Sequence, residues 1–216
     1  MTDGHSLMKR YLMARIIDKE EKKASIALSA IKLFCEKGIQ QTSITEIAKS
    51  AGVAKGTIYL YFKNKEEIVF TIWDILSEQH QEFFQKNITE NMRAKEKILH
   101  YLNFNEFKED VDKEQVLKLF QHFVSSMLID ETQLYTEYFE SFFQKDYDLI
   151  SSYLNEGVEK GELVIDDVDT LTKTIILLLK GLLVKSKASN MNFTETQKAF
   201  NKYINYLLEN CTKEIL

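Results

Sequence analysis

The sequence of 216 residues contains no proline and only 7 glycines. Folds rich in strands or loops need these two residues at their turns, so the shortage favours an all-α fold. Apolar residues make up 44% of the chain and charged residues 28%, which is typical of a globular protein and not of a disordered one. The length is sufficient for one sizeable core or for two smaller domains.

Cysteines and long apolar runs are also scarce. The two cysteines, Cys35 and Cys211, suit neither a disulfide framework nor a metal site, which favours a reducing, cytoplasmic location. No apolar run approaches the roughly 18 residues that span a bilayer. Arg10 and Arg15 interrupt the apolar residues near the N-terminus, so no signal peptide is expected. We therefore expect no metal, no cofactor and no membrane partner.

Charge is distributed unevenly along the chain. Residues 1–65 hold 12 Lys or Arg and 6 Asp or Glu, whereas residues 66–216 hold 16 and 27. A basic segment joined to an acidic one is typical of a phosphate-binding domain attached to a domain with another role. A chance excess of surface lysines would give the same balance. Charge therefore indicates where to look for a nucleic-acid site and does not establish one.

Apolar residues recur at helical spacing almost throughout the chain. A first helix is predicted from Glu21 to Lys37, with Gly38 as its C-terminal stop. Residues 1–19 could extend this helix, form a disordered basic arm for the DNA minor groove, or originate in part from the expression system. Further helices, about nine in total, are predicted near residues 44–51, 54–62, 65–85, 91–108, 113–128, 131–160, 167–188 and 194–213.

The segment from Ser43 to Phe62 has the pattern of a helix-turn-helix. Ser43 and Glu46 are spaced as a capping box, which predicts a helix start. Gly52 lies in a three-residue turn, Ala51-Gly52-Val53, where a positive φ is expected. Two short helices at a fixed angle, packed on a third, leave the second free to enter the major groove of DNA.

The residues of the second short helix suit contact with DNA. Lys55 and Gly56 lie at its start, where free amides and the helix dipole favour phosphate. Thr57 offers a hydroxyl and a methyl group to base edges. Tyr59 and Tyr61 carry hydroxyl groups that can reach phosphates. Tyrosines two residues apart are more often partly buried, so this prediction depends on the whole pattern and not on the tyrosines alone.

The run TSITEIAKSAGVAKGTIYLYFKNKEEI, residues 42–68, closely resembles the DNA-binding domain of TetR-family repressors. It has their alanine-glycine-valine turn, their lysine-glycine-threonine opening of the recognition helix, and their tyrosine-x-tyrosine-phenylalanine ending before a lysine. The resemblance implies a DNA-binding domain at residues 20–80 and an effector-binding and dimerisation domain at residues 81–216. It also implies DNA contacts by Thr42, Ser43, Lys55, Gly56, Thr57, Tyr59, Leu60, Tyr61 and Lys65.

Two positions depart from the commonest form of this family pattern. Tyr61 stands where many members have histidine, and Leu60 stands where some have an aromatic contact. The sequence therefore does not predict which operator bases are read.

Twelve of the 25 aromatic residues lie between Tyr101 and Tyr153. A phenylalanine-rich core between helices accounts for most of them. The family resemblance implies an effector site among the same helices, and the composition favours a small apolar or aromatic ligand held by few polar groups. The candidate ligand-binding residues are His100, Phe104, Gln121, His122, Tyr138 and Phe142.

The last two predicted helices have the pattern of a dimer interface. The helix at 167–188 is apolar around more than half of its circumference, and such a helix must be covered on both sides. A two-fold four-helix bundle with a second copy does this, and TetR-like proteins are built in this way. Such a dimer presents two recognition helices about 34–36 Å apart. The predicted interface residues are Ile175, Leu178, Leu182, Phe200, Ile204 and Leu207.

These features together predict a sequence-specific transcriptional regulator. We expect a ligand-responsive repressor that binds a palindromic double-stranded DNA operator as a homodimer. An activator, or a DNA-binding protein of the same fold without an effector, is the alternative. An enzyme is disfavoured, because no Glu-x-x-His pair, glycine-rich phosphate loop or G-x-S-x-G motif is present.

Overall fold

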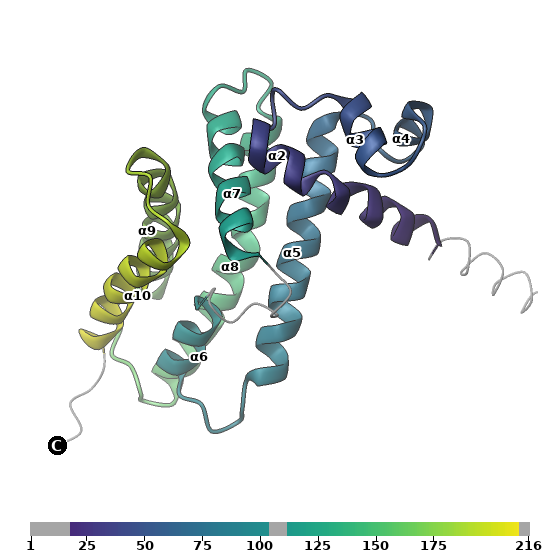
Figure 1. The fold of residues 1–216 in the computed structure, drawn as a ribbon. Coiled ribbons are helices and arrows are strands. Elements are labelled where there is room, and N and C mark those ends of the chain that lie inside the picture. The colour runs from purple at the N-terminus through teal and green to yellow at the C-terminus, as the bar shows by residue number, and fades with distance from the viewer. Residues whose placement is uncertain (1–17, 104–111, 212–216) are drawn as a thin grey trace, which may run out of the picture. The chain divides into compact units, whose positions relative to one another are not determined.

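The computed structural model describes residues 18–103 and 112–211. Within these ranges all regular elements are helical, apart from an isolated β-bridge at Leu163, so the predicted all-α fold is confirmed. Residues 18–29 are helical and precede nine further helices in the described ranges (Figure 1). These are α2 (Ile31–Lys37), α3 (Ile44–Ser50), α4 (Lys55–Tyr61), α5 (Lys65–Asn87), α6 (Ala94–Tyr101), α7 (Lys113–Leu128), α8 (Leu134–Glu159), α9 (Val168–Ala188) and α10 (Phe193–Glu209).

The chain forms two compact units, which we call the N-terminal unit (Met1–Leu76) and the C-terminal unit (Ser77–Leu216). Helix α5 is continuous and contributes residues to both. Residues 1–17 of the predicted extension at residues 1–19 lie outside the described residues, and residues 18 and 19 are helical. No helix in the described ranges combines the length and the apolar composition needed to cross a membrane.

The N-terminal unit is built around a small apolar core. Its buried side chains come from every helix of the unit, so α3 and α4 are held on the helices before and after them. The core residues include Ile26, Ala30, Phe34, Ile47, Ile58, Phe62, Ile68 and Ile72, each no more than 2% exposed. Burial at these helical intervals is what the sequence periodicity predicts.

The first helix is interrupted, in contrast to the single helix predicted from Glu21 to Lys37. The break lies at Ala30, whose N–H donates to the carbonyl of Ala27, three residues before it, at 3.0 Å. The hydroxyl of Ser29 also donates to the carbonyl of Ile26 at 2.7 Å. A serine that bonds to the preceding turn competes with the regular helical ladder, which accounts for the local tightening.

The C-terminal unit is a layered helical bundle in which α8 packs against α6, α7 and α9, and α10 packs against α9 (Figure 1). Aromatic rings fill the space between α7 and α8. Phe123 stacks on Phe139 with ring centroids 5.9 Å apart, and Phe139 meets Phe143 edge to face at 4.7 Å. The phenylalanine-rich core expected between Tyr101 and Tyr153 is therefore present.

Candidate nucleic-acid interface

The start of α3 is fixed by the predicted capping box. The amide of Ser43 donates to the Glu46 carboxylate at 2.9 Å, and the amide of Glu46 donates to the Ser43 hydroxyl oxygen at 3.2 Å. Two amides at the helix start are satisfied in this way. Ser43 itself is exposed, so the capped helix start is open to solvent.

The turn between α3 and α4 depends on the backbone of Gly52. Its φ is 65°, in the region that favours glycine, as the sequence predicts. A Cβ atom at Gly52 would meet nothing within 4 Å, so the requirement is conformational and not one of space. The amide of Val53 then donates to the carbonyl of Ala48 at 3.0 Å, which closes the turn.

Helix α4 buries one narrow face and presents the rest to solvent. Ile58 is fully buried and Phe62, directly after the helix, is 2% exposed. Tyr59 and Leu60 are 54% and 73% exposed, Lys55 and Gly56 are exposed, and Thr57 and Tyr61 are half-buried. A short helix with exposed tyrosine and leucine side chains is typical of a surface that contacts another molecule.

The polar side chains of α4 are not used by the part of the fold that the structure describes. Within the described ranges, Lys55, Thr57, Tyr59 and Tyr61 make no side-chain hydrogen bond and no ion pair. Their donors and acceptors are thus available to a partner.

The surface around α4 is positively charged. Residues 47–65 contain four lysines and no Asp or Glu. Lys49, Lys55 and Lys63 are exposed, and in the part of the chain that the structure describes none of them forms an ion pair. A segment with four lysines and no carboxylate favours an anionic partner such as the phosphate backbone of DNA.

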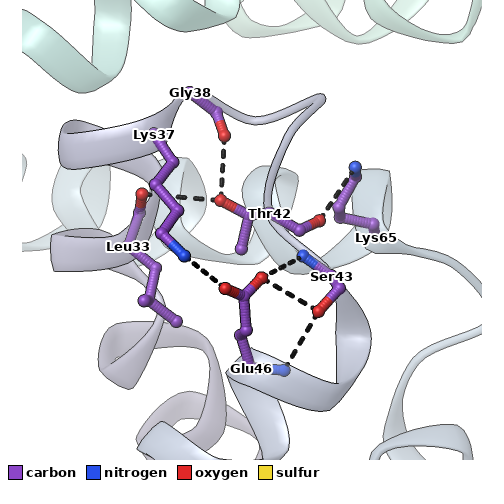
Figure 2. A network of polar contacts seen from close by, with 7 residues as sticks. All are labelled: Leu33, Lys37, Gly38, Thr42, Ser43, Glu46 and Lys65. Atoms are coloured by element: carbon purple, nitrogen blue, oxygen red, sulfur yellow. Dashed lines mark hydrogen bonds and ion pairs between the residues drawn. The ribbon is translucent and has the colours of Figure 1, made fainter.

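The side chain of Thr42 is turned into the protein. It is only 2% exposed, and its hydroxyl donates to the carbonyl of Gly38 at 2.8 Å (Figure 2). Of the two residues predicted to contact phosphate at the start of α3, Thr42 and Ser43, the hydroxyl of Thr42 is therefore already used within the protein. The other predicted position at the start of α3, Ser43, remains exposed.

Lys65 also has partners within the N-terminal unit. Its ammonium group donates to the carbonyl of Gln40 at 2.9 Å. It also donates to the carbonyl of Thr42 at 3.1 Å (Figure 2). Burial lowers the pKa of this half-buried lysine. The family resemblance implied a clamp on the DNA backbone, whereas the ammonium group here binds the protein's own backbone.

An ion pair that the sequence did not indicate joins α2 to α3. The ammonium group of Lys37 contacts the carboxylate of Glu46, the same residue that completes the capping box (Figure 2). The bond from Lys37, followed by the bonds from the amide and hydroxyl of Ser43, lowers the pKa of Glu46 to about 2. Lys37 and Glu46 are nine positions apart in the chain with a loop between their helices, so helical spacing gives no signal for this contact.

The six candidate ligand residues are not all gathered at one place. Tyr138 and Phe142 lie together with ring centroids 6.2 Å apart, and Tyr138 also meets Phe123 at 5.9 Å. The side-chain amide of Gln121 donates to the hydroxyl of Ser186 on α9 at 3.1 Å. His122 is half-buried on α7. Phe104 lies outside the described residues.

His100 belongs to a second ring cluster, formed by α5, α6 and α8. Its ring lies 5.5 Å from that of Phe84, which also meets Tyr101 at 5.1 Å. In this cluster the hydroxyl of Tyr101 donates to the carboxylate of Asp146, and a ring nitrogen of His80 lies 2.8 Å from the carbonyl of Tyr101. Sequence reasoning missed this group, because its members are far apart in the chain and form no motif.

Most of the predicted dimer residues lie inside a single chain. Ile175, Leu182, Phe200 and Ile204 are at most 4% exposed. Such residues have no surface left to lose to a second copy, so the prediction for these four is corrected. Leu178 and Leu207 are half-buried. The exposed apolar side chains of α9 and α10 are instead Leu177, Val184, Tyr203 and Tyr206, between 42% and 68% exposed.

Metal ligands are not clustered in the described ranges, where no group of three or more His, Cys, Asp or Glu side chains could hold an ion.

Comparison with known proteins agrees with this geometry. The family model for "Bacterial regulatory proteins, tetR family" matches residues 26–72. The fatty acid metabolism regulator protein of Bacillus subtilis strain 168 is 42% identical over 80 residues, which are 37% of this chain and 41% of that protein. The chain thus matches about two fifths of that relative's length. The transcriptional regulator QacR of Staphylococcus aureus strain Mu50 is 26% identical over 193 residues, which are 85% of this chain and 95% of that protein.

Solved structures share the fold over most of the chain. The transcriptional regulator FadR from Bacillus subtilis, in complex with stearoyl-CoA, has a TM-score of 0.64 at 22% identity and covers 85% of this chain and 96% of its own. The helix-turn-helix geometry, the matching family model and the shared all-α architecture lead to one conclusion. The chain belongs to the TetR family of transcriptional regulators.

Proposed function

We propose that this chain is a sequence-specific DNA-binding regulator, with α4 as its recognition helix. The observation that carries the proposal is the state of α4. Apart from the buried Ile58, its side chains from Lys55 to Tyr61 are exposed or half-buried, have no polar partner among the described residues, and lie in a segment without carboxylates. A short exposed helix of this kind fits the major groove, which is about 12 Å wide.

Within this proposal, the exposed residues divide into two roles. Thr57 contacts base edges, with its methyl group suited to the thymine methyl group and its hydroxyl to a hydrogen bond. Lys55, Tyr59, Tyr61 and Ser43 contact the phosphate backbone and fix the register of the helix. Leu60 and Gly56, both exposed, allow close approach to the duplex.

A second copy of the chain completes the site, because one recognition helix reads only half of a palindromic operator. We infer that the two copies meet through α9 and α10. Leu177, Gly181 and Val184 are exposed and follow one another at helical spacing on α9, and Tyr203 and Tyr206 are exposed on α10. Apolar and aromatic side chains of this kind are enriched at the centres of protein interfaces.

A small effector of the C-terminal unit would control DNA binding. The rings of Tyr138 and Phe142 are only half-buried, so part of their apolar surface is open to an apolar or aromatic ligand. The stearoyl-CoA bound by the FadR relative is a ligand with a long apolar chain on the same fold. We propose that the protein represses transcription and that the effector relieves this repression. Effector binding is tested by measuring the thermal stability of the protein with a panel of apolar compounds. A rise in stability supports an effector, and no rise with any compound favours the alternative without an effector.

The experiment that tests DNA recognition is selection of duplexes by the purified full chain from a pool of random sequence. We expect a palindromic site to be enriched, with binding that weakens as salt rises. Leu60→Ala should weaken binding to the selected duplex. Leu128→Ala, at a leucine with a similar exposed fraction of 70%, is the matched control. Recovery of no preferred sequence would contradict the proposal.

A further inference from the structure

We propose that the ammonium group of Lys37 neutralises the carboxylate of Glu46, so that a DNA phosphate can approach Ser43 at the start of α3. The role assigned to Lys37 rests on the proposed DNA-binding function, in which Ser43 contacts the phosphate backbone. Lys37 lies outside the set of DNA contacts that the family resemblance implies, and its part in binding is to offset a charge on the protein itself.

A single carboxylate lies within the helix-turn-helix. Residues 37–65 contain five lysines, and Glu46 is the only Asp or Glu among them. Its carboxylate lies directly at the proposed phosphate contact, because its Oε2 atom accepts hydrogen bonds from the amide and from the hydroxyl of Ser43, each at 2.9 Å (Figure 2). A phosphate that binds the hydroxyl of Ser43 therefore comes close to this carboxylate.

The charge of Glu46 opposes such an approach. The pKa of this carboxyl group is lowered to about 2 by its bonds from Lys37 and Ser43, so the group is charged at neutral pH. The capping box also holds it at the start of α3, so it cannot turn away without loss of its bonds to Ser43. Two anions at short range repel each other even at a hydrated surface. Phosphate binding at Ser43 therefore needs a cation beside Glu46.

Lys37 supplies this cation from the end of α2. Its ammonium group contacts Oε1 of Glu46, the oxygen that the bonds from Ser43 leave unused (Figure 2). The cation and Ser43 thus bind different oxygens of one carboxylate, and neither displaces the other. The side chains of Lys37 and Glu46 are 46% and 35% exposed, so the pair lies at the surface, where it can influence a bound phosphate.

The test uses the full chain and compares Lys37→Met, Glu46→Gln and the double variant. Glu46→Gln keeps the capping box, because a glutamine side chain also accepts the bond from the amide of Ser43. Lys32→Met is the matched control, since it removes an equal charge from α2 and takes an ion-pair partner from Glu36. Thermal unfolding of each variant sets a temperature at which all of them are folded.

Affinity is measured for two duplexes, the one that the wild-type protein selects and one of unrelated sequence, because phosphate contacts do not depend on base sequence. We expect Lys37→Met to lower the affinity for both about 5-fold or more, since the charge of Glu46 then repels the phosphate. Glu46→Gln should bind at least as tightly as the wild type, although it breaks the same ion pair, and the double variant should match it.

Lys32→Met should leave the affinity within about 2-fold of that of the wild type, because Glu36 is not part of the capping box and solvent screens exposed charges. If Lys37→Met does not fold, Lys37→Gln takes its place in the comparison.

Three results would overturn the inference. Equal losses of affinity in Lys37→Met and Glu46→Gln would mean that the pair only joins α2 to α3. An equal effect of Lys37→Met with and without Glu46→Gln would mean that Lys37 contacts phosphate directly. Unchanged affinity in Lys37→Met would mean that the charge of Glu46 does not matter.

The two duplexes separate this inference from the proposed function. Failure of the wild-type protein to select any sequence would refute sequence-specific recognition, and the comparison of variants on the unrelated duplex would still decide the role of Lys37. A wild-type protein that binds neither duplex would refute both.

Discussion

The hydroxyl group of Tyr101 on α6 donates a hydrogen bond to the carboxylate of Asp146 on α8, and the pKa of that carboxyl group is raised to about 6. Burial is the main cause, since it disfavours the charged form; the bond from Tyr101 acts in the opposite direction. Burial and the neighbouring carboxylate also raise the pKa of Tyr101. The C-terminal unit therefore contains a carboxyl group that binds its proton more tightly when the chain is folded.

This relationship predicts a pH-dependent effect of Asp146→Asn. Because the pKa is higher in the folded chain, the stabilising contribution of this group is complete below pH 3.8 and is lost as the pH rises through about 6. The free energy of unfolding of the wild type, relative to that of Asp146→Asn, should fall as the pH rises from 3.8 to about 6. At higher pH the difference should stay constant. Urea unfolding across this range measures it, with exposed Asp148→Asn on the same helix as control. Parallel profiles for wild type and Asp146→Asn would contradict the prediction.

Glu46 should behave with the opposite sign. Its pKa is lowered from 4.5 to about 2, first by the bond from Lys37 and then by those from Ser43. The stabilising contribution of this carboxylate is therefore present above pH 4.5 and is lost as the pH falls towards 2. Glu46→Gln should be destabilised relative to wild type at neutral pH, and the difference should shrink in acid. Exposed Glu159→Gln is the control, and a difference that does not change with pH would count against the assignment.

Gly157 allows α6 and α8 to approach closely. A Cβ atom at this buried position would lie 2.7 Å from the Cβ of Ala94 and 2.6 Å from a methyl group of Leu163. Gly157→Ala should lower the free energy of unfolding by about 1–3 kcal/mol through overpacking. Glu159→Ala, exposed on the same helix, should change it by less than about 0.5 kcal/mol. Equal stability of the two variants would show that the neighbours adjust without cost.

The apolar surface of α9 and α10 predicts the oligomeric state. Leu177→Glu places a charge where we propose that two copies meet, so the protein should sediment as a monomer and lose affinity for a palindromic duplex. Leu128→Glu, at a leucine exposed at the end of α7, should remain a dimer. Analytical ultracentrifugation distinguishes the two outcomes. A dimer that survives Leu177→Glu would place the interface elsewhere.

Thr57 offers two distinct groups, and two substitutions separate them. Thr57→Val removes the hydroxyl and keeps a methyl group, whereas Thr57→Ser keeps the hydroxyl. If the methyl group reads thymine, Thr57→Ser should reduce discrimination at one operator position by about 1 kcal/mol and Thr57→Val should not. Binding of matched and mismatched duplexes measures this. Loss of affinity for all duplexes alike would indicate a backbone contact instead.

Local signals in the sequence predicted the helix-turn-helix accurately. The capping box of Ser43 and Glu46 and the positive φ of Gly52 each depend on residues within a few positions of one another, so spacing alone is sufficient. The partners of Lys65 could not be found in this way. They lie more than 20 residues away in the chain, and they are backbone carbonyls, which leave no trace in residue type.

Four of the predicted dimer-interface residues proved to be buried within the chain, for a different physical reason. Apolar periodicity on α9 and α10 is real, but a helix that is buried in its own chain and a helix that is buried by a partner have the same pattern. Ile175 and Ile204 proved to be core residues, and the exposed stripe is offset to Leu177 and Tyr206. The cluster that contains the Tyr101 ring and the Asp146 carboxylate was not predicted, because its residues come from separate helices.

The independence of the α4 side chains from the fold has an evolutionary consequence. Substitutions at Thr57, Tyr59 or Leu60 break no internal bond within the described residues and uncover no core. If α4 reads the operator as we propose, related chains can acquire new operators there while they remain folded. Thr42 and Lys65 have no such latitude, because their partners are inside the protein. Diversification of binding sites among descendants of this chain should therefore concentrate on α4 and spare the residues that hold α3.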